Sequence, residues 1–401
     1  MNQSELRELL STEGLRLLDS LPAWQSNDEI VRTVAELRKA GHSAGLVAAV
    51  LSQAKLRAKA VNKFGPFAER MLFTEAGLEQ ATRLSVAAQH AGRFSRADVK
   101  WVADLGCGIG ADALAIAALG LNVTAVERDE TTAALASYNL APWGNAQVVH
   151  GDAESADLSG VDGIYLDPAR RDSRVRLTNP ADWTPSLDFA FGLADRYPTG
   201  IKLGPGVDRD LIPDDAEAQW VSVGREVVEL GLWFGTLARP GIRRAALVIG
   251  DHGTAELTAE ADSADEPVGD LGRFLYEPDG AVIRARLIGD LVREIGGRML
   301  DTSIAYFSAD TAVVTPFASC FEIVADFALD KRSLKKELAE RKIGTLEIKK
   351  RGVDIDPATF RTSLSLKGKN SATLILTRVG GKRRALLAQR TTLAQTPNPR
   401  S

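Results

Sequence analysis

One short stretch, in which an apolar run passes into three alternating glycines, constrains this 401-residue chain more than any other. Residues 101–105 have the composition of a buried strand, and Gly106, Gly108 and Gly110 follow at every second position. Apolar residues then recur at helical spacing from Ala113. Glycines in such a turn adopt backbone angles that other residues avoid, and they let a ligand approach the main chain closely. The stretch therefore predicts a strand, a tight ligand-binding turn and a helix.

Acidic residues stand at the ends of four successive apolar runs, namely Asp104, Glu127, Asp152 and Asp167. The carboxyl ends of parallel strands meet at one edge of a sheet, so we expect these side chains to gather beside the glycine turn. A dinucleotide-binding domain is an alternative, because Gly106, Gly108 and Ala111 satisfy a relaxed form of its fingerprint. A carboxylate about 20 residues after the glycines suits a ribose in either case. The dinucleotide interpretation accounts only for the first two acids.

Strand and helix patterns alternate over residues 93–252, which predicts an α/β fold with a doubly wound parallel sheet. Residues 1–92 read mostly as helices, and residues 281–295 as one further helix. Acidic and small polar residues dominate 253–270, which predicts a solvated linker. The remaining strands of the sheet are expected at 200–203 and, as a closing antiparallel arrangement, at 219–223, 226–235 and 243–250.

The net charge of −4 conceals a strongly basic segment near the C-terminus. Residues 331–390 hold 17 Lys and Arg against 5 Asp and Glu, a net charge of +12, so the rest of the chain carries −16. The patterns predict strands at 320–327, 345–350, 372–379 and 384–389, with helices at 331–342 and 357–364. A basic α+β module on an acidic body is suited to binding a polyanion. Its expected phosphate contacts are Lys335, Lys336, Lys349 and Lys350.

Several classes of protein are disfavoured by the composition. Two cysteines far apart in sequence and four scattered histidines argue against a disulfide framework and a metal site. No apolar run reaches the ~18 residues of a membrane span. The first residues lack the basic start and apolar core of a signal peptide. We therefore expect a cytoplasmic protein that has neither metal nor membrane partner.

The glycine turn, the ordered acids, the loop 167–171, the upstream segment 71–74 and the basic tail together resemble a known family. They are similar to bacterial class I S-adenosylmethionine-dependent methyltransferases with a C-terminal THUMP-like domain. The catalytic half resembles the RNA cap guanine-N2 methyltransferase (trimethylguanosine synthase) group. The resemblance implies a Rossmann-like fold, S-adenosyl-L-methionine as cofactor and methylation of a base amine in RNA, with ribosomal or transfer RNA as the expected partner.

The resemblance also implies roles for the cofactor site. The turn with Asp104, Gly106, Gly108 and Gly110 would hold the methionine part of the cofactor, Glu127 the ribose and Asp152 the adenine amine. Thr74 is expected to cap a helix in a segment that resembles the lid of such enzymes, and a plain connecting helix is the alternative.

The loop after the fourth strand departs from the family pattern. Amine methyltransferases of this group carry two prolines and an aromatic residue after the acid, whereas Pro168, Ala169 and Arg170 stand here. Asp167 and the Pro168 carbonyl are expected to accept the protons of the amine. Arg170 is expected either to stack on the base or hold a phosphate, or to pair with a neighbouring acid.

These features suggest four regions and leave two other functions open. The regions are a helical part with the lid segment at 1–92, a methyltransferase domain at 93–252, an acidic linker at 253–270 and a basic THUMP-like domain at 271–394. One alternative is a methyltransferase that acts on a small molecule or a protein. The other is a nucleic-acid-binding protein whose methyltransferase domain is degenerate.

Overall fold

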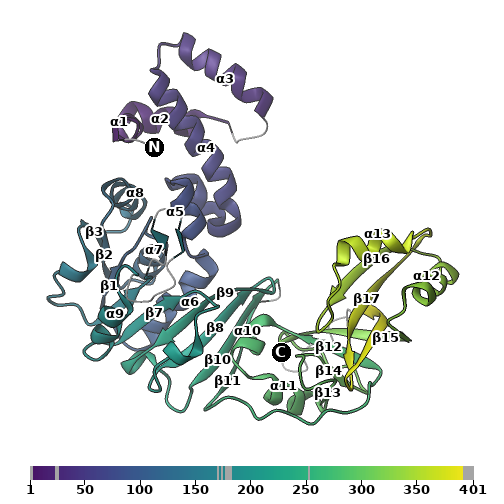
Figure 1. Cartoon of the computed structure of the whole chain (residues 1–401). Helices are drawn as coiled ribbons and strands as arrows, with labels where there is room; N and C mark the ends of the chain where they lie inside the picture. The colour runs from purple at the N-terminus through teal and green to yellow at the C-terminus, as the bar shows by residue number, and fades with distance from the viewer. Residues whose placement is uncertain are drawn as a thin grey trace, which may run out of the picture. The chain divides into compact units, whose positions relative to one another are not determined.

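The computed structural model describes residues 3–22, 27–168, 171–172, 175–176, 183–251 and 253–391 (Figure 1). The chain forms two compact units. The first unit comprises Met1–Leu203, Asp208–Ala216 and Gly231–Arg239, and the second comprises Gly204–Val207, Glu217–Leu230 and Pro240–Ser401.

Helices open the first unit, as predicted. Leu6 and Leu9 of the first helix pack with Leu18 of the second and with Leu46 and Val50 of the fourth in one apolar cluster. No helix in the part of the chain that the structure describes is long and apolar enough to cross a membrane. The helices are α1 (Gln3–Leu10), α2 (Thr12–Ser20), α3 (Asn27–Lys39), α4 (Ala44–Phe64), η1 (Gly65–Arg70), α5 (Glu75–Gln80) and α6 (Leu84–Arg96).

A parallel sheet follows, which confirms the doubly wound fold. Its strands lie in the order β7-β4-β1-β2-β3, and each neighbouring pair is parallel. Val102, Val123 and Tyr165 bury their side chains with residues of the helices α6 and α7 in one core. The elements are β1 (Trp101–Leu105), α7 (Ala111–Ala118), β2 (Asn122–Glu127), α8 (Glu130–Leu140), β3 (Ala146–His150), η2 (Ala153–Ser155), β4 (Gly163–Leu166), α9 (Leu187–Ala194), β7 (Thr199–Leu203), η4 (Arg209–Leu211) and η5 (Gly235–Leu237). The short strands β5 (Arg171–Asp172) and β6 (Val175–Arg176) form a separate antiparallel pair.

The strand order continues through β9 (Glu226–Trp233), β8 (Glu217–Val223), β10 (Arg244–Gly250) and β11 (Gly253–Ala259). Two predictions are corrected here. β10 pairs in parallel with β8, although an antiparallel arrangement was expected. Residues 253–259, expected as a linker, form β11, which pairs antiparallel with β10 from Gly250–Gly253 to Arg244–Ala259. An edge strand needs backbone partners on one side only, so its polar composition is easily mistaken for that of a linker.

A seven-stranded sheet lies wholly in the second unit, in the order β13-β14-β12-β15-β18-β17-β16. Its predicted elements between 320 and 389 are confirmed within a few residues. The single helix predicted at 281–295 is wrong, because Arg286 adopts a left-handed φ of 60° and divides it in two. The elements are β12 (Phe274–Pro278), α10 (Gly280–Arg284), α11 (Ile288–Ile295), β13 (Arg298–Met299), β14 (Phe307–Ala309), β15 (Ala318–Ala328), α12 (Lys331–Glu340), β16 (Ile343–Lys350), α13 (Pro357–Leu364), β17 (Asn370–Val379) and β18 (Lys382–Arg390).

The helices α12 and α13 cover one face of this sheet (Figure 1). Leu334 and Leu338 of α12 and Leu364 of α13 are buried with Leu374 of β17 and Leu387 of β18. Because the apolar face of α12 points inward, its four basic side chains stay exposed on the other faces.

Candidate functional site

The glycine turn between β1 and α7 has the geometry that its sequence predicts. Gly106, Gly108 and Gly110 have φ values of 89°, 57° and 84°, a region that residues with a Cβ rarely adopt. The backbone N–H groups of Gly106 and Cys107 donate to the Val126 carbonyl at 2.9 and 3.0 Å, which ties the turn to β2. A Cβ added to Gly108 would meet no atom within 4 Å. The turn therefore leaves open space above its middle glycine.

Two of the predicted acids lie at neighbouring strand ends beside this turn. One oxygen of Glu127 accepts the Gly108 N–H at 3.0 Å, and the other accepts the Asp129 N–H at 2.8 Å. Asp152 follows β3, is exposed, and accepts the Glu154 N–H at 3.0 Å. Each carboxylate oxygen has a second lone pair, so both side chains can still accept from a ligand.

Asp104 lies in β1, two residues before Gly106, and is only 1% exposed. Burial raises the pKa of this carboxyl well above its usual range, and the negative charges of Asp112 and Asp167 add to the shift. Its Oδ2 atom has no hydrogen-bond partner among the described residues. A buried oxygen of this kind is suited to hydrogen-bond with a bound ligand.

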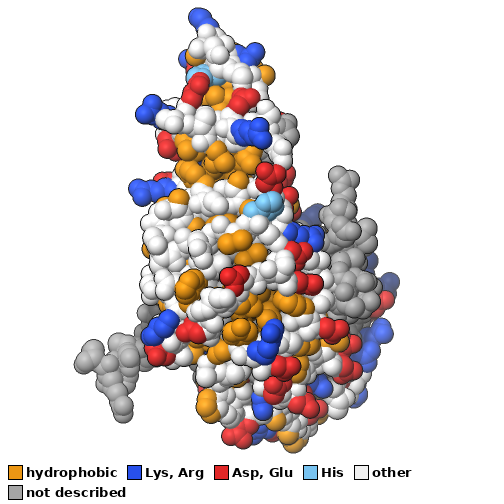
Figure 2. Space-filling view, turned by 90° about the vertical axis from the view of Figure 1, so that its left-hand side faces the viewer, with side chains coloured by type: hydrophobic (Ala, Val, Ile, Leu, Met, Phe, Trp, Pro, Cys, Tyr) orange, Lys and Arg blue, Asp and Glu red, His pale blue; other side chains and the backbone are white. Residues whose placement is uncertain are grey.

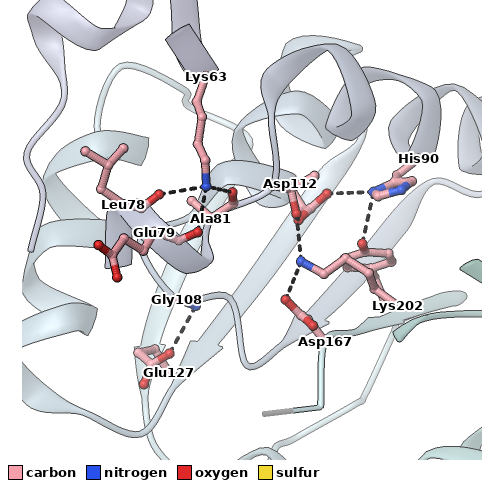
Figure 3. A network of polar contacts seen from close by, with 12 residues as sticks. Lys63, Leu78, Glu79, Ala81, His90, Gly108, Asp112, Glu127, Asp167 and Lys202 are labelled. Carbon is pink, nitrogen blue, oxygen red and sulfur yellow. Dashed lines mark hydrogen bonds and ion pairs between the residues drawn. The ribbon is translucent and has the colours of Figure 1, made fainter. Parts of the chain in front are cut away.

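Asp167 follows β4 directly and lies beside the glycine turn. Its Oδ2 atom is 2.5 Å from the Nζ atom of Lys202, which stands on the neighbouring strand β7 (Figure 3). A Cβ on Gly106 would lie 3.9 Å from the Asp167 carbonyl oxygen. Pro168 is buried, and Ala169 and Arg170 lie outside the described residues.

Lys202 begins a chain of buried polar contacts that the sequence did not predict. Its ammonium donates to the Thr82 hydroxyl at 3.0 Å, and that hydroxyl donates to Asp112 Oδ2 at 2.7 Å. Asp112 Oδ1 is 2.8 Å from His90 Nδ1, which is 2.9 Å from the Tyr165 hydroxyl. The available signal was Lys202 itself, the single charged residue in the strand Thr199–Leu203.

The charges around Lys202 are predominantly negative. Burial acts to raise the pKa of Asp112, but the hydrogen bonds from His90 and Thr82, with the positive charge of Lys202, outweigh it and leave this pKa below its usual value. Asp112 is therefore an ionised carboxylate in the core. Together with Asp167 it faces the single ammonium of Lys202 (Figure 3).

Thr74 caps α5, as predicted, and its hydroxyl accepts the Gly77 N–H at 2.9 Å. This first turn of α5 lies close to the glycine turn, because a Cβ on Gly77 would approach the Ile109 side chain to 2.7 Å. The structure thus brings Thr74 to the glycine turn.

Two buried amide side chains fix the backbone just before Thr74. Gln53 donates to the Phe73 carbonyl at 2.7 Å and accepts the Phe73 N–H at 2.9 Å. Asn139 makes the matching pair with Leu72 at 3.1 and 2.7 Å. These side chains come from α4 and α8, so the predicted lid segment is hydrogen-bonded from two sides.

The four lysines predicted as phosphate contacts lie in the second unit and differ in their surroundings. Lys335 and Lys350 are exposed, and Lys336 is exposed with Glu340 at 3.8 Å. Lys349 is 21% exposed and pairs with Glu277 at 2.7 Å. The role of Lys349 in phosphate binding stays a prediction, but its ion pair with Glu277 leaves its ammonium less open to a phosphate than those of the other three lysines.

Comparisons with known proteins agree with this geometry. A family model described as a methyltransferase domain matches residues 103–166, a THUMP domain-like model matches 318–390, and a domain of unknown function matches 2–60. An uncharacterized S-adenosylmethionine-dependent methyltransferase, found in two strains of Mycobacterium tuberculosis, is 32% identical over 342 residues. That match covers 81% of this chain and 91% of the relative.

The fold also matches a crystal structure assigned to a methyltransferase from Porphyromonas gingivalis W83. The TM-score is 0.73 at 20% sequence identity, and the match covers 98% of this chain and 100% of the other. The relative from Mycobacterium tuberculosis and the match to the methyltransferase domain show that the cofactor is S-adenosylmethionine, which excludes the dinucleotide alternative. The chain belongs to the family of S-adenosylmethionine-dependent methyltransferases, with a Rossmann-like catalytic domain and a C-terminal THUMP-like domain.

Proposed function

We propose that this methyltransferase acts on an exocyclic amine of a base in RNA. The observation that carries the proposal is the ion pair between Asp167 and Lys202 beside the glycine turn. An ionised carboxylate at that place accepts an N–H from an amine and turns the nitrogen lone pair toward the cofactor. Such a site suits a nitrogen nucleophile that carries protons.

The residues around the turn fit the cofactor. Glu127 would hold the ribose hydroxyls, Asp152 the adenine amine, and the open space above Gly108 would admit the methionine part. The unpartnered oxygen of Asp104 would hydrogen-bond with a polar group on that part. The cofactor supplies a methyl group on a positively charged sulfur, which the surrounding carboxylates favour by their charge.

The chain's own contribution to the transfer is orientation and charge. Asp167 would accept an N–H of the amine in a hydrogen bond, and the Pro168 carbonyl would accept the other. The nitrogen becomes positive as the new N–C bond forms, so the bond to Asp167 strengthens in the transition state. The methylated nitrogen then gives up one proton, which Asp167 can accept and pass to water. Arg170 would stack on the base or hold a phosphate, and pairing with a neighbouring acid is the alternative.

The second unit supports RNA as the substrate. The THUMP-like match covers 318–390, and residues 331–390 carry the net charge of +12. Exposed lysines such as Lys335, Lys336 and Lys350 gain affinity for phosphates by releasing counterions. The N-terminal helices offer no comparable surface on the face in Figure 2, where acidic and basic side chains are interspersed. We also propose that the catalytic half is similar to the RNA cap guanine-N2 methyltransferases.

The test is methyl transfer from labelled S-adenosylmethionine to RNA taken from cells that lack the enzyme, so that target sites are unmethylated. The RNA is digested to nucleosides, and the labelled nucleoside is identified by mass spectrometry. We expect a single N-methylated base, whose rate of formation falls steeply with Asp167→Asn. Label that enters only protein or small molecules in parallel reactions would overturn the RNA proposal.

A further inference from the structure

We propose that Lys202 is a positioning residue for methyl transfer, which holds the Asp167 carboxylate charged and aimed at the substrate amine. This inference rests on the proposed role of Asp167. Lys202 would not touch the substrate or the cofactor, and it would act only through Asp167.

The position of Lys202 is unusual for a lysine. It stands in a strand in the middle of the sheet, and its side chain is 13% exposed. Burying an ammonium is costly unless it is paired and hydrogen-bonded. Lys202 meets both conditions, because Asp167 lies 2.5 Å from its nitrogen and the Thr82 hydroxyl lies 3.0 Å from it. The two contacts fix where the ammonium sits.

The unequal burial of the two partners argues that the ion pair has a role in the site. Asp167 is 37% exposed and could be solvated by water, whereas Lys202 is largely buried. Replacing a buried ion pair with apolar residues is often neutral or stabilising, so stability alone does not explain the pair. The pair is explained if Asp167, which would face the substrate, needs a fixed positive charge beside it.

The ionisable groups around the pair come from several elements. Asp104 comes from β1, Asp112 from α7, His90 from α6 and Tyr165 from β4, and Lys63 of α4 is near enough for its charge to interact with Lys202. Three carboxyl groups thus share the site with Lys202. If the ammonium were removed, Asp167 would lose the favourable charge of Lys202 while the ionised Asp112 remained, and its pKa would rise.

A protonated Asp167 accepts the amine N–H only weakly and offers no negative charge to the developing cation, so loss of Lys202 is expected to act through pH. At low pH the variant should be slow because Asp167 is protonated, and the defect should shrink as the pH rises. A purely structural loss would lower activity by the same factor at every pH. This difference separates a positioning role from a packing role.

The experiment compares the full-length protein with Lys202→Met and Lys202→Arg in RNA methylation across pH. Lys202→Met should lose about tenfold or more in kcat near neutral pH. It should also shift the acid limb of the pH–rate profile to higher pH. Lys202→Arg keeps the charge, so it should recover part of the rate and should place the acid limb at the same pH as in wild type. Lys100→Met, at an exposed lysine paired with Asp98, is the matched control and should leave both unchanged.

Two further measurements keep the inference falsifiable. Binding of S-adenosylhomocysteine by calorimetry should stay within about threefold of wild type in every variant, which shows that the fold and cofactor site persist. Thr82→Val keeps the ammonium but removes one anchor, and it should lower kcat without moving the acid limb.

The outcomes separate this inference from the proposed function. A Lys202→Met profile that falls in parallel at all pH values, without rescue by Lys202→Arg, would overturn the role of Lys202. If Asp167→Asn is inactive and Lys202→Met is fully active, the inference fails and the proposed function stands. If Asp167→Asn is fully active, the proposed role of Asp167 fails first.

Discussion

The carboxylate of Glu127, at the end of β2, accepts the backbone N–H of Gly108 at 3.0 Å. This bond joins the second acid of the sheet edge to the middle of the glycine turn, and it holds the carboxylate before any ligand arrives. A preorganised acceptor loses less entropy when it binds.

Replacement of Glu127 by alanine should therefore weaken cofactor binding. Charge-assisted hydrogen bonds to hydroxyls contribute about 1.5–3 kcal/mol, which corresponds to a loss of about ten- to a hundredfold in affinity. Calorimetry with S-adenosylhomocysteine measures it. Glu130→Ala, at an exposed acid three residues later, is the control and should bind as wild type.

Gly108→Ala should weaken cofactor binding through the space it fills. Gly108 has a φ of 57°, and an added methyl group would project into the open space above the turn. Gly120→Ala is a matched control, because Gly120 has a φ of 83° and also meets no atom within 4 Å. Both variants should lose about 1–2 kcal/mol of stability from backbone strain. Equal affinities in the two would show that the cofactor does not occupy the space above Gly108.

The titration of Lys63 should make the free energy of unfolding depend on pH in the alkaline range. Its ammonium donates to the carbonyls of Leu78, Glu79 and Ala81 at 2.7–2.8 Å, at the end of α5 (Figure 3). Burial, with the charge of Arg83, nevertheless lowers the pKa of Lys63 from 10.5 to about 8. Between these values the unfolded chain binds the proton and the native protein does not, so the free energy of unfolding rises with pH.

Urea unfolding of Lys63→Met at neutral pH and near pH 10 measures this contribution. The variant should gain less stability over that range than wild type. Lys55→Met, at an exposed lysine on the same helix, should keep the wild-type increment. An unchanged increment in Lys63→Met would show that Lys63 does not titrate differently in the two states.

RNA binding should respond differently to the four lysines of the second unit. Lys335→Ala and Lys350→Ala should each flatten the dependence of log affinity on log salt by no more than about 0.7, one phosphate contact. Lys349→Ala should instead leave the slope unchanged and lower stability, because it leaves Glu277 without its partner at 2.7 Å. Filter binding over a salt series, with thermal unfolding, tests both. A flatter slope for Lys349→Ala would show that Lys349 is a phosphate contact.

The sequence was sufficient for the parts of the fold that repeat a strong local pattern. The glycines at 106, 108 and 110 and the acids at the strand ends are local signals, so their places at one sheet edge followed from chain order. The strand β11 was missed because its polar residues suit an edge as well as a linker. The break at Arg286 was missed because the apolar residues on both sides of it keep the spacing of one continuous helix.

The buried polar contacts around Lys202 could not be predicted in the same way. Lys202, Thr82, Asp112 and His90 come from segments far apart in sequence, and only the folded sheet brings them together. A charged residue inside an apolar strand is a signal that something must neutralise it. It does not say which acid will do so. The pairing of Lys349 with Glu277 is likewise a contact between distant segments.

The central claim, that Asp167 orients an amine of an RNA base, is tested most directly by single-turnover methylation of RNA with Asp167→Asn. Cofactor and enzyme are saturating, so the rate reports the transfer itself. We predict that S-adenosylhomocysteine binds as in wild type while the transfer rate falls by about a hundredfold or more, because the lost bond is strongest in the transition state. An unchanged transfer rate would contradict the account.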